Sequence, residues 1–213
     1  MARIDHHVHT TRYSPDSDIS PRQLILAAKE AGLDGVVITE HDEQWRADEL
    51  AELSGQAGGL VVLSGVEVSA REGHFLVYGL PDLGGIEVGI SLRDLIAEAD
   101  RRGAAVVAAH PFRWGQDFEA IAEEHGDGLA GVELVSNNVT PETRAQTERL
   151  LSRRRLATTG SSDGHQPEVV GCYFTEFPGP IRTMAEFVAA LKRGEGRPRH
   201  RAGVWLASGE VND

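Results

Sequence analysis

The chain has 213 residues, enough for one large domain or two small ones, and its 40% hydrophobic and 25% charged residues are typical of a soluble globular protein. Its formal net charge of −12 argues against a surface for long nucleic acid, and its single cysteine, Cys172, excludes an intramolecular disulfide and suits a reducing compartment. We find neither a signal peptide nor a run of about 18 apolar residues, so we expect a cytoplasmic protein without a membrane span.

Short apolar runs alternate with amphipathic segments from the first residues onward. Residues 4–8 predict a strand, the Pro-broken residues 9–18 predict a loop, and Ser20-Pro21 begins a helix that Gly32 ends. There follow a strand at 35–39, a helix at 44–54, a strand or strand pair within 60–68, a strand at 74–78, and a Gly-rich lid or loop at 81–89. The second half predicts helices at 91–102, 118–125, 140–153 and 184–192, with strands at 104–109, 131–135, 156–159 and 171–174.

This alternation of strands and helices indicates an α/β fold with a parallel sheet covered by helices. No linker divides the chain, so we predict a single domain over residues 1–213, with 195–213 as a loose tail. Its oligomeric state is left open. The residues able to do chemistry fall mostly at the carboxyl ends of predicted strands, which in an α/β barrel is the face where catalysis occurs.

Histidines recur at the ends of the predicted strands. His7 and His9 are two residues apart in an extended segment, so their side chains share a face and could bind one metal ion, whereas His6 points the other way. The histidines in such positions are His7, His9, His41, His74, His110 and His165, and the accompanying carboxylates are Asp16, Glu67 and Asp163. Imidazoles with a few carboxylates suit Zn, Mn or Fe better than Ca or Mg alone. We expect His125 and His200 to lie outside this group.

The motifs around these residues follow one another in a set order along most of the chain. They are Asp5-His6-His7-Val8-His9-Thr10, Ser14-Pro15-Asp16, Ile38-Thr39-Glu40-His41-Asp42, Gly65-Val66-Glu67-Val68-Ser69, His74, Ala109-His110-Pro111 and the closing segment 160–165. Together they resemble the motifs of the PHP (polymerase and histidinol phosphatase) family of metal-dependent phosphoesterases. Two positions depart from that pattern, because Glu40 stands where the family usually has Asp and His6 where it usually has an apolar residue.

The resemblance implies a distorted (β/α)7, TIM-like barrel with two to three divalent metal ions, which would be Zn, Mn or Fe. Carried over residue by residue, the first ion would be held by His7, His9, Glu67 and Asp163, the second by Glu67, His74 and His110, and the third by Asp16, His41 and His165. Every one of these positions holds a residue able to bind metal, which argues against a non-catalytic metal-binding or docking module.

The hypothesis for the activity is metal-dependent hydrolysis of a phosphate ester, with a small phosphomonoester or a nucleotide as substrate. A hydroxide bridging the two ions that share Glu67 would attack phosphorus, and the ions and a cationic side chain would stabilise the phosphoryl oxygens. Arg113 is the first candidate for this cation because it follows His110-Pro111, and Arg12 is the second. Glu67, Asp163 and Arg113 are therefore the predicted catalytic residues.

Other readings of the same residues remain open. One is exonuclease-like hydrolysis of short oligonucleotides, and another is hydrolysis of an amide or cyclic ester, which inhibition by inorganic phosphate would discriminate. Histidinol phosphate is a further possible substrate that no residue singles out. Asn137 and Asn138 either contact the substrate or form the turn before the helix that begins at Thr140-Pro141.

Overall fold

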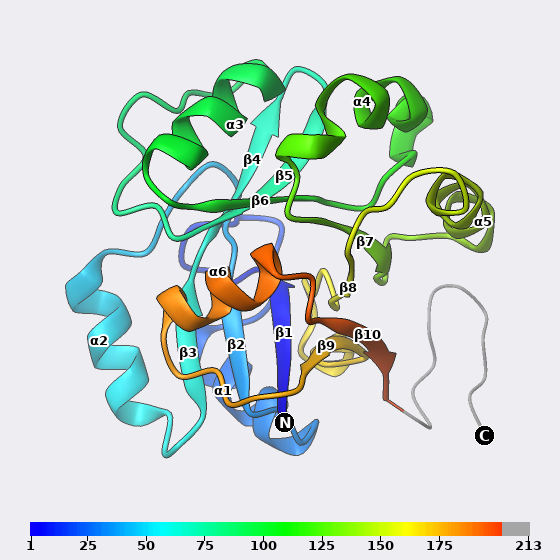
Figure 1. Ribbon diagram of the computed structural model, residues 1–213. Coiled ribbons are helices and arrows are strands. Elements are labelled where there is room, and N and C mark those ends of the chain that lie inside the picture. The colour runs from blue at the N-terminus through cyan, green and yellow to red at the C-terminus, as the bar shows by residue number, and fades with distance from the viewer. Residues whose placement is uncertain (202–213) are drawn as a thin grey trace.

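The computed structural model describes residues 1–201, which form two five-stranded sheets with helices against them (Figure 1). The strand order is β10-β9-β1-β2-β3 in the first sheet and β4-β5-β6-β7-β8 in the second. The strands are β1 (Ala2–Val8), β2 (Gly35–Ile38), β3 (Val61–Ser64), β4 (Val66–Ala70), β5 (Gly73–Tyr78), β6 (Ala105–Ala108), β7 (Gly131–Val135), β8 (Thr158–Gly160), β9 (Tyr173–Phe177) and β10 (Arg197–His200). The helices are α1 (Pro21–Glu30), α2 (Ala47–Gln56), α3 (Leu92–Arg101), α4 (Phe118–His125), α5 (Pro141–Leu151) and α6 (Met184–Lys192).

Both sheets are mixed, so the prediction of a parallel sheet was wrong in part. Neighbouring strands are parallel in β1-β2-β3 and in β6-β7-β8, but β9 runs antiparallel to β1, and β5 runs antiparallel to β4 and β6. The reversal at β5 follows from the turn at Arg71-Glu72, which joins β4 to β5 directly and leaves no length for a crossover helix. Because β5 runs backwards, its first residues pair with the last residues of β4, and His74 lies opposite Ser69.

The segment 60–68 is a strand pair whose members belong to different sheets. Gly65 separates β3 from β4, and a side chain there would meet the ring of Tyr78 at 2.7 Å and the carbonyl oxygen of Val77 at 2.8 Å. Only glycine therefore allows the chain to pass from one sheet to the other at this point. The sheets also meet at the isolated bridges between Val8 and Gly164 and between His41 and Glu67.

The apolar core is arranged in layers. Between the two sheets lie side chains from both of them and from α6, including Ile4, Val37, Leu76, Val107 and Phe187. A second cluster packs α1 and α2 against the first sheet, and a third packs α3, α4 and α5 against the second, so that Figure 1 shows α2 beside β3 and α3 near β4. This layering leaves the carboxyl ends of the parallel strands free for polar residues.

The predicted helix starts are confirmed at α1 and α5. Ser20 caps α1 by accepting a hydrogen bond from the backbone N–H of Gln23, with Pro21 as the first helical residue. Thr140 and Pro141 do the same for α5. The helix expected at 44–54 begins later, at Ala47, and has no side-chain cap.

The expected loose tail, 195–213, contains a strand. β10 pairs antiparallel with β9, and Arg199 adds a 3.2 Å ion pair to Glu176 on the neighbouring strand. The rest of that tail, beyond residue 201, lies outside the described residues. Within residues 1–201, no helix combines the length and the apolar character needed to cross a bilayer.

The segment 81–89, which the sequence left open as a lid or a loop, is a loop attached to the second sheet. The side chain of Ile86 packs into the core, and the backbone N–H of Gly89 donates to the carbonyl oxygen of Ser69 at 2.7 Å.

Candidate metal centre

The predicted metal ligands converge at one edge of the molecule, where β1, β2, β4, β6 and β8 end and β5 begins. Most of these residues belong to groups of three whose ligand atoms all lie within 4.8 Å of one another. The others lie within ion-pair distance of a member of those groups. The full set is His7, His9, Asp16, His41, Glu67, His74, His110, Asp163 and His165. The antiparallel direction of β5 explains how a histidine at the start of a strand, His74, reaches this edge.

The inner part of the centre, which we call the buried half, consists of His7, His9, Glu67 and Asp163. Their side chains are at most 2% exposed. Nε2 of His7 lies 3.2 Å from Oδ1 of Asp163 and 3.4 Å from Oε2 of Glu67, and Nε2 of His9 lies 3.4 Å from both of these oxygens. Two imidazole nitrogens and two carboxylate oxygens thus face one small volume.

Three of these atoms are buried and make no hydrogen bond of good geometry: Nε2 of His7, Nε2 of His9 and Oε2 of Glu67. Oε2 of Glu67 also lies 2.9 Å from Nδ1 of His41, so this oxygen links the buried residues to the more exposed ones. A buried polar atom left without a partner costs about 1–3 kcal/mol, so a cluster of them on the same point calls for an explanation. A divalent cation would satisfy all of them at once, because imidazole nitrogen and carboxylate oxygen are its usual ligands. The residues present therefore fit a metal ion.

The other oxygen of Glu67 faces a second pair of imidazoles. Oε1 of Glu67 lies 3.0 Å from Nδ1 of His74 and 3.1 Å from Nε2 of His110. One carboxylate thus lies between two groups of nitrogens, with a separate oxygen directed to each. Such an arrangement would suit a carboxylate shared by two metal ions.

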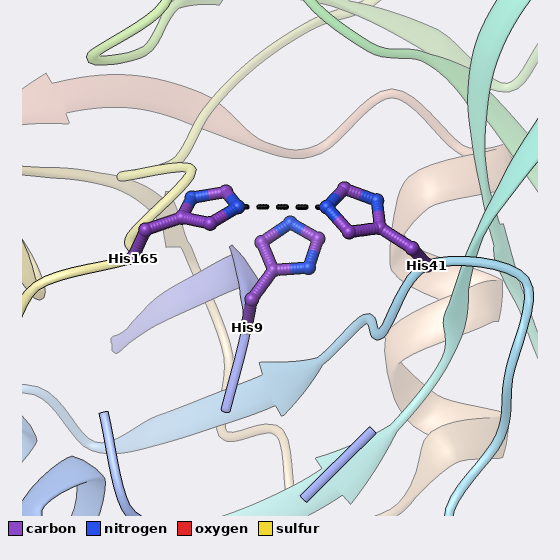
Figure 2. Close-up of side chains that lie close together, drawn as sticks. All are labelled: His9, His41 and His165. Carbon is purple, nitrogen blue, oxygen red and sulfur yellow. Dashed lines mark hydrogen bonds between the residues drawn. The ribbon is translucent and has the colours of Figure 1, made fainter. Parts of the chain in front are cut away.

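The outer part, which we call the open half, consists of Asp16, His41 and His165. Oδ2 of Asp16 is 3.2 Å from Nε2 of His41 and 3.2 Å from Nε2 of His165. The two imidazole nitrogens are 3.5 Å apart, and Figure 2 marks this contact between the histidines with a dashed line. Their side chains are exposed by 56%, 28% and 17% for Asp16, His41 and His165. His9 lies between the halves, since its ring stacks on those of His41 and His165 with centroids 4.2 and 4.3 Å away.

The electrostatics of the centre favour positive charge. Burial alone would lower the pKa of His7, but the carboxylates of Asp163, Glu133 and Glu67 outweigh it and raise that pKa well above its usual value. Burial would likewise raise the pKa of Glu67, yet His7 and the neighbouring histidines hold it well below the usual range. The negative charge gathered here is what a divalent cation would neutralise.

Glu133 is a residue of this centre that the sequence reasoning missed. It is fully buried in β7, where Oε1 lies 3.0 Å from Nδ1 of His7 and Oε2 accepts the backbone N–H of His110 at 2.8 Å. Since an ionised carboxylate only accepts, Nδ1 of His7 carries a proton, and Nε2 is therefore the nitrogen that would bind a metal. The available signal was a lone charge within the apolar run Gly131-Val132-Glu133-Leu134-Val135.

Glu40 acts on His9 through Ser14. Ser14 donates its hydroxyl hydrogen to Oε2 of Glu40 at 2.6 Å and lies 3.3 Å from Nδ1 of His9, so it accepts the Nδ1 proton and leaves Nε2 of His9 free. Oε1 of Glu40 accepts the indole N–H of Trp45 at 2.8 Å. The departure from Asp at this position thus leaves an outer hydrogen-bond network around a predicted ligand in place.

The predicted cationic side chains differ in position. The guanidinium of Arg113 lies 3.9 Å from Oδ2 of Asp163, at the rim of the centre. Arg12 is instead paired with Glu49 and stacks over Tyr13.

The two asparagines serve the loop that follows β7. The side-chain amide of Asn138 donates to Oδ2 of Asp163 at 2.6 Å, and the backbone N–H of Asn137 donates to the carbonyl oxygen of Ser162. Asn138 therefore orients a predicted ligand.

The histidines expected outside the group lie outside it. His6 points into the core, with Nδ1 2.6 Å from the hydroxyl of Tyr78 and Nε2 3.1 Å from that of Thr175, and burial lowers its pKa to about 4. His125 lies 3.6 Å from Glu124 at the end of α4. The polar partners of His6 explain how it occupies a position that is apolar in the family pattern.

Comparison with known proteins links this chain to one family. A model of the PHP-associated segment matches residues 141–195. The uncharacterized protein MJ1587 of Methanocaldococcus jannaschii is 30% identical over an alignment of 142 residues, which covers 62% of this chain and 77% of that protein.

Solved structures share the fold at lower identity. A two-domain protein from Bacteroides vulgatus, containing a predicted PHP-like metal-dependent phosphoesterase, has a TM-score of 0.73 at 22% identity over 94% of this chain; the chain spans 65% of its length. An amidohydrolase from Chromobacterium violaceum has a TM-score of 0.68 at 18% identity over 94% of this chain and 99% of that one. With the family-model match and the coverage of the archaeal relative, these findings show that the chain belongs to the PHP family.

Proposed function

We propose that this chain is a metal-dependent phosphoesterase that hydrolyses a small phosphomonoester or a nucleotide. The observation that carries this proposal is the set of buried, unpartnered atoms on His7, His9 and Glu67, which converge beside Asp163. Such an arrangement costs free energy in a folded protein and is explained by divalent cations.

In this proposal the first ion is held by His7, His9, Glu67 and Asp163, the second by Glu67, His74 and His110, and the third by Asp16, His41 and His165. Zn, Mn and Fe are the candidate metals because imidazoles dominate the donor set. When bound, the ions would supply an activated water at neutral pH and neutralise charge on the phosphoryl group. We further propose that the two sheets make up the distorted barrel of the family.

The side chains of this protein have their own parts in the reaction. Arg113, 3.9 Å from Asp163, donates hydrogen bonds to phosphoryl oxygens, where a guanidinium fork matches their geometry. Asn138 holds the carboxylate of Asp163, and Glu133 holds the imidazole of His7, so that both ligands keep one orientation during turnover.

Replacing Arg113 tests its part separately. We expect Arg113→Ala to lower kcat/KM by about 100-fold, the usual loss when a donor to developing charge is removed. Arg12→Ala is the matched control, because Arg12 pairs with Glu49. An unchanged kcat/KM in Arg113→Ala would remove Arg113 from this role.

Amide or cyclic-ester hydrolysis is the second candidate, because a structural neighbour is an amidohydrolase and an activated water also attacks carbonyl carbon. A phosphoesterase requires a pocket for an oxyanion, so inorganic phosphate should inhibit it competitively. Short oligonucleotides belong in the same substrate panel as the exonuclease-like alternative. The net charge of −12 disfavours long nucleic acid, and a cytoplasmic location stays a prediction.

The deciding experiment combines elemental analysis of the purified chain with phosphate release from phosphomonoesters, nucleotides and short oligonucleotides, with Mn or Zn added. We expect bound divalent metal and metal-dependent phosphate release. Asp163→Asn should lose both, while the matched control His200→Gln, on the exposed strand β10, keeps both.

Two results would contradict the proposal. Bound metal without phosphate release from any compound would favour the amide or cyclic-ester reading. Protein that retains no divalent metal under these conditions would rule out the metal centre itself.

A further inference from the structure

We propose that Trp114 is a stacking surface for the organic part of the substrate, so that the preferred phosphomonoesters carry a flat, unsaturated ring. This inference rests on the proposed function, because it takes the metal centre as the place of the phosphoryl group. It adds a substrate class and a specificity-determining residue.

A cavity of about 550 Å³ adjoins the metal centre. Its lining includes His74, His110, Arg71, Arg113, Trp114 and Gln116. The volume falls in the usual range for small-molecule sites, about 300–1,000 Å³. Because two predicted ligands form part of its wall, a molecule whose phosphate binds at the centre has its remaining atoms in this cavity.

Trp114 is 74% exposed, and exposure alone says little about a single apolar side chain. What distinguishes this indole is its surroundings. The guanidinium carbon of Arg113 lies 4.1 Å from the ring centroid and covers one face, while the rings of His74 and His110 approach at 5.4 and 6.0 Å with steep interplanar angles of 76° and 67°. Because 74% of the side chain is exposed, the indole keeps surface on which a planar ligand can stack.

The backbone that presents Trp114 is held in an unusual conformation. Phe112 and Trp114 have φ angles of 64° and 55°, a region that bulky residues rarely adopt. Gln116 holds the loop, since Oε1 accepts the backbone N–H of Phe112 at 3.1 Å and Nε2 donates to the carbonyl oxygen of Glu72 at 2.7 Å. The ring of Phe112 also packs on Phe118 with centroids 5.7 Å apart. The indole is thus positioned before any ligand binds, which lowers the entropy lost on binding.

Arg113 contacts both the metal centre and Trp114. Its guanidinium lies 3.9 Å from Oδ2 of Asp163 and stacks on the indole of Trp114. A substrate whose phosphate reaches Arg113 therefore has its organic part beside Trp114. A saturated polyol gains little from an indole face, whereas a nucleobase or another flat ring stacks on it.

The test compares adenosine 5′-monophosphate with ribose 5-phosphate, which has the same sugar and phosphate but no base, using the metal-loaded protein. We expect kcat/KM to be about 10- to 100-fold higher for the nucleotide, mainly through KM, as the strength of base stacking implies. Trp114→Ala should bring this ratio close to one, and Trp114→Phe should restore much of it. Leu26→Ala, which removes another exposed apolar side chain, on α1, is the matched control and should keep the ratio.

A binding measurement separates this inference from the proposed function. Adenosine has no phosphate, yet stacking on Trp114 should quench the tryptophan fluorescence, and Trp114→Phe should lose that quenching. Normal phosphate release with equal kcat/KM for both compounds, unaffected by Trp114→Ala, would overturn the inference and leave the proposed function intact. If no compound releases phosphate, the proposed function fails, and adenosine quenching alone then supports or refutes the stacking surface.

Discussion

The two halves of the metal centre are built from similar side chains in different surroundings. In the buried half, His7, His9, Glu67 and Asp163 are at most 2% exposed, and three of their atoms have no hydrogen-bond partner. In the open half, Asp16 is 56% exposed and takes the two imidazoles of His41 and His165 as neighbours. Water can solvate the polar atoms of the open half. Those of the buried half have no access to water, so their partners must come from the protein or from a bound ion.

This difference predicts unequal metal binding. A cation in the buried half would be weakly screened and would satisfy unpartnered atoms, so it should bind tightly and exchange slowly. In the open half, water can hydrogen-bond to the same side chains that would bind a cation. A cation there should therefore exchange more readily. The hydrogen bonds that His7 donates to Glu133 and that His9 donates to Ser14 add to the contrast, because both orient predicted ligands of the buried half.

Removing all the metal should have the largest effect. Stepwise addition of a chelator should strip the open half first and the buried half second, and phosphate release should fall by several orders of magnitude once the activated water is lost. Elemental analysis of samples taken along the titration, with activity measured on each, follows both steps. Loss of every ion in a single step would break the proposed difference between the halves.

His7→Ala should have the next largest effect. It removes an imidazole that faces Asp163 and Glu67, so we expect loss of the tightly bound ion and a fall in kcat/KM of more than about 100-fold. This fall is larger than the one expected when only a hydrogen-bond partner of a metal ligand is removed. Metal content and kcat/KM are measured together, with circular dichroism to show that the variant is folded. Tight metal binding by folded His7→Ala would contradict its assignment as a ligand.

Glu133→Gln should weaken the buried half without removing a ligand. Glutamine keeps the shape but loses the charge that orients and polarises His7, which should lower metal affinity by about 10- to 100-fold. The measurement is the Kd for Mn or Zn by competition with a coloured chelator. Glu148→Gln, on exposed α5, is the matched control, and equal Kd values for the two variants would mean that Glu133 only fills space.

Asp16→Asn should have the smallest effect of the four changes. It removes the charge of a half-exposed carboxylate, so we expect the open half to bind metal about tenfold more weakly while the tightly held metal stays. Metal content before and after dialysis, compared with that of Glu133→Gln, distinguishes the halves. If Asp16→Asn also lost the tightly held metal, the two halves would have to act as one unit.

Local sequence rules predicted much of the centre. The period of an extended strand placed His7 and His9 on one face and His6 on the other, and the structure has this arrangement. Ser20-Pro21 and Thr140-Pro141 marked helix starts through their own backbone chemistry. These features depend on residues close in sequence, so they could be read without a fold.

Features that join distant segments were harder to read. Glu133 looked like one polar residue in an apolar strand, and its partner His7 is 126 residues away. Arg12 was the second candidate for the phosphate-binding cation, and its partner in the structure is Glu49, 37 residues along the chain. Asn138 could belong to a turn or a substrate site, and its side-chain contact is with Asp163, which is 25 residues away.

By itself, the sequence determined which residues could bind metal, where most strands and helices lie, and which histidines face away, because these depend on side-chain chemistry and on the period of the local backbone. Only the tertiary structure decided that β5 runs antiparallel and brings His74 to the ligand edge, that the chain changes sheets at Gly65, and that one half of the centre is buried while the other is open. The physical reason is that strand direction, burial and hydrogen-bond partners depend on segments far apart in the chain, which meet only when both sheets pack around their shared core.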